Sequence, residues 1–88
     1  MRFRFSGVLL RFVNYRKEIE LEAETLGIAL QELAQECPLL SSVMYDSQGK
    51  VRSAHRLFLG GELIRDPDPA LGLKKTDCIE VMTAIAGG

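Results

Sequence analysis

Residues 78–88 read CIEVMTAIAGG. The first six alternate between apolar residues that would face inward and residues that would face outward, a pattern that predicts a strand. The next three are small or apolar, and the sequence then ends on Gly87 and Gly88. Because termini are usually poorly ordered, one interpretation is an ordinary frayed end. Because glycine lacks a Cβ atom, the other is a thin tether that carries the Gly88 carboxylate into a narrow site on another protein.

The composition is that of one small globular domain. Of the 88 residues, 47% are hydrophobic and 26% are charged, and the net charge of −1 leaves no basic excess for binding nucleic acid. Arg11 interrupts the first apolar run, which argues against a secretory leader. No stretch approaches the length of apolar sequence that spans a membrane. We therefore expect a cytoplasmic protein that binds neither nucleic acid nor membranes.

The first half of the chain predicts a β-hairpin followed by a helix. Alternating residues indicate strands at 1–10 and 17–23, joined by a connection that contains the turn-prone Asn14. Thr25 offers a helix N-cap, and Pro38 ends the helix because a residue before proline is pushed out of the α region. Apolar residues recur between them at helical spacing, and we expect this stripe to face the core: Leu26, Ala29, Leu30, Leu33, Ala34 and Cys37.

The second half predicts three more strands. In chain order we expect a short apolar connection of at most one helical turn at 38–45, a turn at 46–49, a strand at 51–59, a primed turn at Gly60-Gly61, a short strand at 62–64, a crossing loop from 66, and the strand at 78–83. In the last strand Ile79, Val81 and Thr83 would face inward. Because the first and last strands are both strongly apolar on one face, we expect them to pair in parallel at the centre of an α+β roll.

Two cysteines and one histidine are the candidates for metal or thiol chemistry. Cys37, Cys78 and His55 belong to three separate elements and form no C-x-x-C pair, so they do not predict a zinc site. We expect two buried or half-buried thiols and a structural histidine. A thiol enzyme that uses either cysteine with His55 is the weakest alternative, because no nucleophile motif accompanies them.

The order of elements and the terminal Gly-Gly resemble the β-grasp (ubiquitin-like) fold, and specifically the MoaD/ThiS family of sulfur carriers, over the whole chain. The strongest point is residues 83–88, TAIAGG, which are similar to the family's Pro-Ala-Val-Ala-Gly-Gly ending. Further similarities lie in residues 33–39 (LAQECPL), 57–62 (LFLGGE) and 73–81 (LKKTDCIEV). The length and residues 46–52 resemble the longer branch, which includes the cysteine-biosynthesis carrier and the thiocarboxylate carriers of secondary-metabolite and siderophore pathways. The sequence departs from the family pattern at Gly60, Thr76, Cys78 and Thr83.

The resemblance implies a definite architecture. Residues 1–83 would form an α+β β-grasp domain with a mixed sheet of four to five strands and one main helix packed on one face. Residues 84–88 would form a flexible C-terminal tail that ends in Gly-Gly.

The resemblance also implies a protein cosubstrate in place of an enzyme. A partner adenylyltransferase related to ubiquitin-activating enzymes would use ATP and Mg²⁺ to adenylate Gly88, and sulfide or a sulfurtransferase persulfide would then leave a thiocarboxylate. Ala84, Ile85, Ala86 and Gly87 would enter the partner's active site. This chain would bind no cofactor or metal, and an accepting enzyme would use the sulfur to make cysteine, a cofactor or another metabolite. If the gene continues beyond Gly88, a metalloprotease would trim the precursor.

The docking face for these partners should be apolar at its centre and charged around it. Phe58 and Met82 point outward by alternation on the face that a covering helix leaves free, so we predict them as the centre. Arg4, Arg52 and Arg56 are predicted for the rim.

Two other functions are compatible with the sequence. A ubiquitin-like modifier would form an isopeptide bond between Gly88 and target lysines. A non-reacting β-grasp interaction module would make the Gly-Gly ending incidental.

Overall fold

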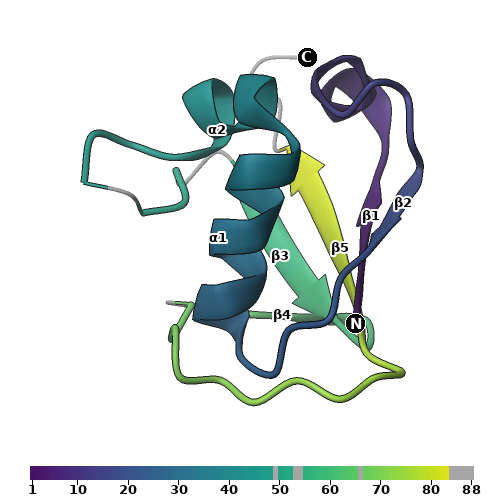
Figure 1. Cartoon of the computed structure of the whole chain (residues 1–88), viewed down its shortest axis with the longest axis vertical. Coiled ribbons are helices and arrows are strands. Elements are labelled where there is room, and N and C mark those ends of the chain that lie inside the picture. The colour runs from purple at the N-terminus through teal and green to yellow at the C-terminus, as the bar shows by residue number, and fades with distance from the viewer. Residues whose placement is uncertain (49, 53–54, 66, 84–88) are drawn as a thin grey trace.

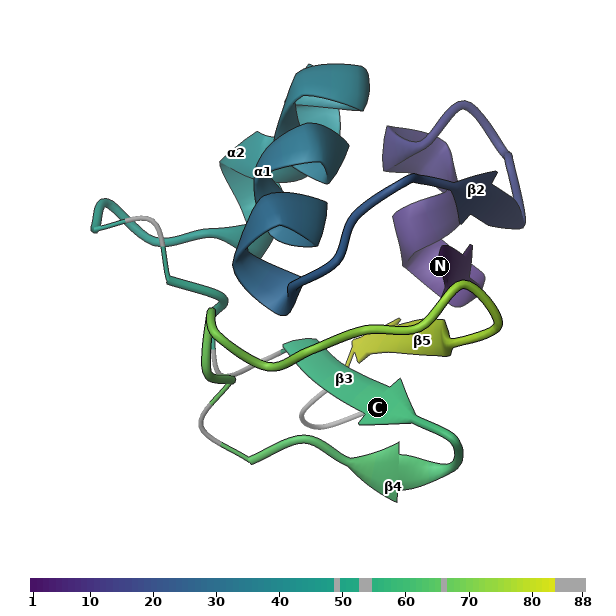
Figure 2. The ribbon, with the colours of Figure 1, turned by 60° about the horizontal axis from the view of Figure 1, so that its bottom comes forward.

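The computed structural model describes residues 1–48, 50–52, 55–65 and 67–83. These residues form one mixed sheet with helical segments on one side and at one end of it (Figures 1 and 2). In chain order the elements are β1 (Arg2–Phe5), the 3-10 helix η1 (Gly7–Phe12), β2 (Glu18–Glu20), α1 (Leu26–Glu36), α2 (Pro38–Met44), β3 (His55–Leu59), β4 (Glu62–Leu63) and β5 (Cys78–Thr83). Among the described residues, no helix is both long and apolar enough to cross a lipid bilayer.

The sheet has the strand order β2-β1-β5-β3-β4, with the first and last strands of the chain side by side near its centre. β1 pairs in parallel with β5, and its residue Phe3 lies opposite Ile79. β2 pairs antiparallel with β1, and β3 pairs antiparallel with both β5 and β4. The predicted parallel pairing and the α+β β-grasp fold are confirmed.

The core lies between the sheet and α1. Side chains of successive strand residues point to opposite faces, so the alternation along each strand places one set of residues beneath the helix. These residues are fully or almost fully buried: Phe3, Phe5, Ile19, Leu57, Ile79 and Val81. From the predicted stripe of α1, Leu26, Ala29, Leu33 and Cys37 are buried, whereas Leu30 and Ala34 are half-buried. The predicted core face of the helix is thus confirmed.

The start of α1 has the predicted N-cap. The Thr25 hydroxyl accepts a hydrogen bond from the Ile28 amide at 3.3 Å, and Thr25 itself has extended backbone angles. An N-cap of this kind supplies an acceptor to an amide that has no partner within the helix.

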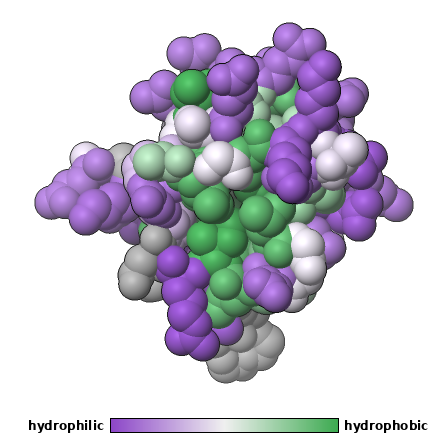
Figure 3. Space-filling view, turned by 90° about the horizontal axis from the view of Figure 1, so that it is seen from below, coloured by the Kyte–Doolittle hydropathy of each residue, from purple (hydrophilic) through white to green (hydrophobic). Residues whose placement is uncertain are grey.

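Residues 67–77 close the lower end of the core and supply two more acceptors to the helix. The first two amides of α1, from Leu26 and Gly27, donate to the carbonyls of Leu71 and Pro69, each at 2.9 Å. A Cβ atom at Gly27 would lie 3.0 Å from the Pro69 Cβ atom, so this close approach favours glycine. Figure 3, which views this end, shows apolar residues gathered at its centre and hydrophilic residues around them.

The predicted strand at residues 1–10 is wrong beyond Phe5. Gly7 has a φ of +62°, a conformation that glycine adopts freely and that ends the extended run. The chain then forms η1, which buries Leu9 in the core. A continuous apolar run carries no period that would distinguish a strand from a helical turn. The second predicted strand is also shorter, because only Glu18–Glu20 pair with β1.

The segment at 38–45 is more regular than predicted. It forms the seven-residue helix α2 with a proline in its first turn, a favoured position because the amide missing from proline would have no helical partner there. Leu40 and Met44, one turn apart, are buried. The helical part of this segment is therefore longer than the single turn that was predicted.

Of the strand predicted at 51–59, the described part of the chain shows β3 at His55–Leu59. Val51 makes an isolated bridge to Tyr45, and residues 53–54 lie outside the described part of the chain. The predicted primed turn is confirmed, because Gly60 and Gly61 have φ angles of +61° and +84°.

Candidate functional site

The candidate site consists of the C-terminal segment and the sheet face beside the strand that leads into it. Gly88 and the predicted tail residues lie outside the described residues: Ala84, Ile85, Ala86 and Gly87. The last described residue is Thr83, at the end of β5, and β5 lies between β1 and β3. Residues 84–88 therefore continue directly from an interior strand of the sheet.

The second part of the candidate site is the side of the sheet that α1 and α2 do not cover (Figure 2). We call this side the open face. Its residues alternate with the core residues along the strands: Arg2, Arg4, Glu18, Glu20, Arg56, Phe58, Leu63, Cys78, Glu80 and Met82. Phe58 lies opposite Glu80, and Arg56 lies opposite Met82, so Phe58 and Met82 are diagonal neighbours. The two residues predicted for the docking centre are thus adjacent on one face.

Exposure differs between these two residues. Met82 is 45% exposed, whereas Phe58 is half-buried. Leu63 on β4 lies opposite Phe58 and adds a third apolar side chain, which the sequence prediction missed. The signal that could have identified Leu63 is the primed turn, because it fixes which residues of a hairpin lie opposite one another.

Arg4 lies on the open face but is already engaged in ion pairs. Its Nη2 and Nε atoms donate to Glu18 Oε2 at 2.8 and 3.2 Å, and its Nη1 atom lies 3.9 Å from Glu80. The hydrogen bond between the two side chains lowers the pKa of the Glu18 carboxyl and raises the pKa of Arg4. Arg2 also approaches Glu18, at 3.6 Å. The part of the open face over β1 and β2 is therefore a balanced ion-pair cluster.

The other two predicted rim arginines have different positions. Arg56 is exposed on the open face opposite Met82. Arg52 precedes β3, and the assumption that it shares the alternation of that strand is wrong. Its amide donates to the Met44 carbonyl at 2.8 Å and its Nε atom to the Tyr45 carbonyl at 3.1 Å, so it lies at the C-terminal end of α2. The role of either arginine in docking stays a prediction.

His55 has partners for both ring nitrogens. Its Nε2 atom lies 2.8 Å from the Val43 carbonyl oxygen, and its Nδ1 atom lies 3.2 Å from Thr83 Oγ1. Such pairing is what we expect of a structural histidine. Cys78 is half-buried at the opposite end of β5 from Thr83, so the structure does not bring Cys78 and His55 together.

Cys37 is buried, and its Sγ atom lies 3.5 Å from Arg16 Nη2. Both ring nitrogens of His55 are engaged by other groups, so neither thiol has this ring as its base. Within residues 1–48, 50–52, 55–65 and 67–83, no three side chains of the His, Cys, Asp and Glu types gather as a metal site would require.

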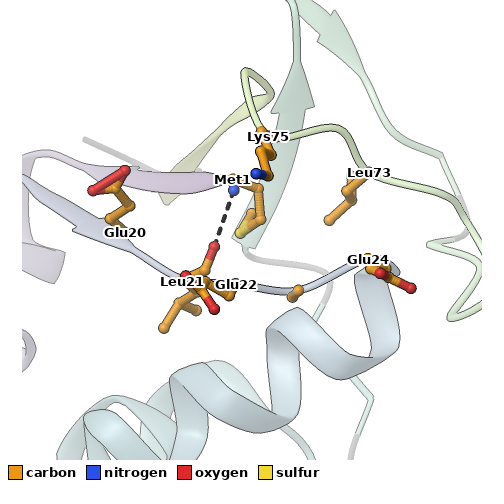
Figure 4. Close-up of a pocket in the computed structure, with 8 residues that line it drawn as sticks. Met1, Glu20, Leu21, Glu22, Glu24, Leu73 and Lys75 are labelled. Atoms are coloured by element: carbon orange, nitrogen blue, oxygen red, sulfur yellow. Dashed lines mark hydrogen bonds between the residues drawn. The ribbon is translucent and has the colours of Figure 1, made fainter.

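A surface depression lies beside the N-terminus, at the end of the sheet opposite to Thr83 (Figure 4). The Met1 amino group donates to the Leu21 carbonyl oxygen at 3.0 Å within it. Glu20, Glu22 and Glu24 are exposed and spread along one edge, with Lys75 across from them. Because β1 and β5 are parallel, this depression lies at the Cys78 end of β5, away from Thr83. Its polar groups do not converge on a common point.

Comparison with known proteins identifies the class of fold. No family model matches the sequence, and neither does any curated protein. SAMP1 from Haloferax volcanii matches with a TM-score of 0.80 and 18% identity over 99% of this chain and 97% of that chain. A chain of the Amycolatopsis orientalis BexX/CysO complex matches with a TM-score of 0.82 and 15% identity over 99% and 98%. Mycobacterium tuberculosis CysO, described as an antigen, matches with a TM-score of 0.79 and 18% identity over 96% and 98%.

These likenesses extend over nearly the full length of both chains in each pair. The chain therefore has the β-grasp fold of the ubiquitin-like proteins, as the resemblance in sequence implied. At these identities the likeness defines the fold, and function has to be argued from the site.

Proposed function

We propose that this chain is a sulfur carrier whose C-terminal Gly88 becomes a thiocarboxylate. The observation that carries the proposal is the combination of a β-grasp domain, similar over its full length to CysO and SAMP1, with a Gly-Gly ending that follows an interior strand. Residues 1–83 would be the domain, and residues 84–88 the reactive tail. The reaction would take place in the cytoplasm, where ATP is available.

A carboxylate needs activation because its leaving group would otherwise be oxide. A partner adenylyltransferase would form a bond between a Gly88 carboxylate oxygen and the α-phosphorus of ATP, with release of pyrophosphate. Hydrosulfide would then attack the acyl carbon and expel AMP, which leaves a carbon–sulfur bond at Gly88. If a sulfurtransferase persulfide attacks in its place, a thiol must reduce the acyl disulfide first formed. ATP and Mg²⁺ would be bound by the partner, whose groups would stabilise the charge on the phosphates.

This chain would contribute a tail and a docking face. Apart from Ile85, the tail residues Ala84, Ala86 and Gly87 have at most a methyl side chain, which suits entry into a narrow channel. Phe58 and Met82 would form the centre of the contact on the open face, with Arg56 beside them. The BexX/CysO complex of Amycolatopsis orientalis supports the general picture, because in it a chain of this fold belongs to a complex of two proteins. A sulfur-accepting biosynthetic enzyme would be the second partner.

The proposal is tested by the intact mass of the chain after incubation with ATP, Mg²⁺, sulfide and the adenylyltransferase encoded nearest to its gene. Exchange of one carboxylate oxygen for sulfur adds about 16 Da. Reactions without ATP, and a variant that lacks Gly87 and Gly88, are the matched controls and should show no gain. The proposal would be contradicted if the adenylyltransferase is active on another carrier protein but leaves the mass of the complete chain unchanged.

A ubiquitin-like modifier is the second candidate, and the full-length likeness to SAMP1, a small archaeal modifier protein, favours it over the remaining alternatives. Conjugation would attach an entire second chain to a lysine of the target, so the same mass measurement separates the two functions. For a non-reacting interaction module, removal of Gly87 and Gly88 would leave partner binding unchanged.

A further inference from the structure

His55 joins three elements at the point where β5 ends. It is the first residue of β3 and lies opposite Thr83 in the β3–β5 ladder. Its ring contacts the Thr83 hydroxyl through Nδ1 at 3.2 Å and the Val43 carbonyl oxygen of α2 through Nε2 at 2.8 Å. One side chain therefore links the end of β5 to the helix that lies beside it.

The direction of each hydrogen bond follows from the chemistry of the partners. A carbonyl oxygen can only accept, so Nε2 must carry the proton. In the neutral ring, Nδ1 then accepts the proton of the Thr83 hydroxyl. Val43 lies in the last turn of α2, where carbonyl groups have no amide partner within the helix, so His55 also satisfies the end of α2.

The end of β5 has less backbone support than the rest of this strand. The pairing of β1 with β5 stops where Phe5 lies opposite Val81. Beyond that point, Met82 and Thr83 pair with β3 and with no other strand of the described part of the chain. Thr83 is the last residue of β5, and its side chain is hydrogen-bonded to His55.

We propose that His55 is a positioning residue that holds Thr83, the end of β5, in place against α2. The inference rests on the proposed function, in which Gly88 must reach a partner's active site. Five residues span at most about 17 Å when fully extended. Because this reach is short, a displacement of Thr83 would directly limit how far Gly88 could extend into the partner. The link to α2 would hold Thr83 in position.

Thr83→Val tests the link with a matched control. Valine keeps the branched shape but loses the hydroxyl, whereas Thr83→Ser keeps the hydroxyl. In adenylation assays with the neighbouring adenylyltransferase and ATP, we expect kcat to fall about fivefold in Thr83→Val, as for the loss of one ordinary hydrogen bond. We expect KM to stay within about twofold, because the docking residues are unchanged, and Thr83→Ser to behave like the wild type.

A double-mutant cycle assigns the effect to His55. His55→Phe removes both ring nitrogens, so it should lower kcat at least as much as Thr83→Val. Because the two residues would act through the same link, adding Thr83→Val to His55→Phe should cause no further decrease. Additive decreases, a raised KM with unchanged kcat, or equal losses in Thr83→Val and Thr83→Ser would each overturn the proposal.

A second measurement needs no partner protein. In NMR relaxation of the free chain, the backbone order parameter of Thr83 should fall in Thr83→Val and not in Thr83→Ser, and the His55 ring nitrogens should shift only in the valine variant. Equal order parameters in all three proteins would overturn the proposal. If the wild-type chain is not adenylated, the sulfur-carrier function fails, and this NMR comparison still decides whether His55 holds the end of β5.

Discussion

On β5, Ile79 and Val81 point into the core, whereas Glu80 and Met82 lie on the open face of the same strand. The covered face is apolar, and α1 closes it. The open face combines the ion pairs around Glu18 with a small apolar cluster around Met82. The two faces are built from alternate residues of the same strands.

The two faces of the sheet differ in role: one stabilises the fold, and the other is available to bind a partner. Burial of apolar area contributes most of the favourable free energy of folding, and here that area lies on the covered face. Exposed ion pairs contribute little to stability because water and salt screen them. The open face can therefore be suited to a partner with little effect on folding, and each prediction below tests that division.

The largest expected effect is on the covered face. Ile79→Ala should lower the free energy of unfolding by about 2–5 kcal/mol, because it leaves a cavity at a fully buried position of an interior strand. Met82→Ala, further along the same strand, should cost less than about 1 kcal/mol. Urea unfolding of both variants gives the comparison, and equal losses would contradict the division between the two faces.

The next effect is on partner binding. Replacing Phe58 and Met82 together by alanine should weaken binding of the adenylyltransferase by about tenfold or more, because buried apolar anchors carry most of the energy of an interface. Ile28→Ala on α1 is the matched control, since Ile28 is 46% exposed and Met82 is 45% exposed. Isothermal titration calorimetry would measure both dissociation constants. Unchanged affinity in the double variant would remove the open face as the docking surface.

A smaller effect is expected at the cap of the covering helix. Thr25→Ala should lower the free energy of unfolding by about 1 kcal/mol, because the Ile28 amide loses its acceptor. Thr25→Ser keeps the acceptor and should lose far less. Thermal unfolding would rank the three proteins, and binding to the partner should be the same for all of them. A Thr25→Ala protein as stable as the wild type would show that the cap does not contribute.

The last effect is absent at neutral pH and concerns Tyr45, which packs on the covered side and donates its hydroxyl to the Leu30 carbonyl at 3.1 Å. Burial raises the pKa of Tyr45 from 10.0 to about 12. The pKa of Tyr45 is higher in the folded state than in the unfolded state, so burial of the neutral hydroxyl favours folding. This stabilisation is complete below pH 10 and is lost as the pH rises from 10 to about 12. A pH titration of ultraviolet absorbance on Tyr15→Phe, which leaves Tyr45 as the only tyrosine, measures the value. Ionisation near pH 10 would show that the ring is solvated.

The sequence predicted the elements whose pattern is local. The alternation in β5 identified Ile79 and Val81 as core residues, and the spacing in α1 identified Leu33 and its neighbours. Thr25 and the Gly60-Gly61 turn were recognised because the backbone there requires particular residue types. Each of these signals lies within a few residues along the chain.

Several of the errors concern partners that are distant in sequence. Gly7 marks the end of the first strand locally, but the coiling of the following residues into η1 accompanies the burial of Leu9 in the core. Extending the alternation of β3 backwards predicts Arg52 on the open face, but its side chain donates to the Tyr45 carbonyl at the end of α2. Likewise, the bonds of His55 to Val43 and Thr83 span 12 and 28 residues, and no local pattern specifies them.

The sequence by itself determined which strand residues face inward, where the main helix begins, and that a Gly-Gly ending follows the last strand, because side-chain period and backbone preference act over a few residues. Tertiary structure alone decided that β3 pairs with β5, which arginines are held in ion pairs, and that His55 links the end of β5 to α2. Those outcomes depend on how distant segments pack together, and the packing is set by the whole core at once.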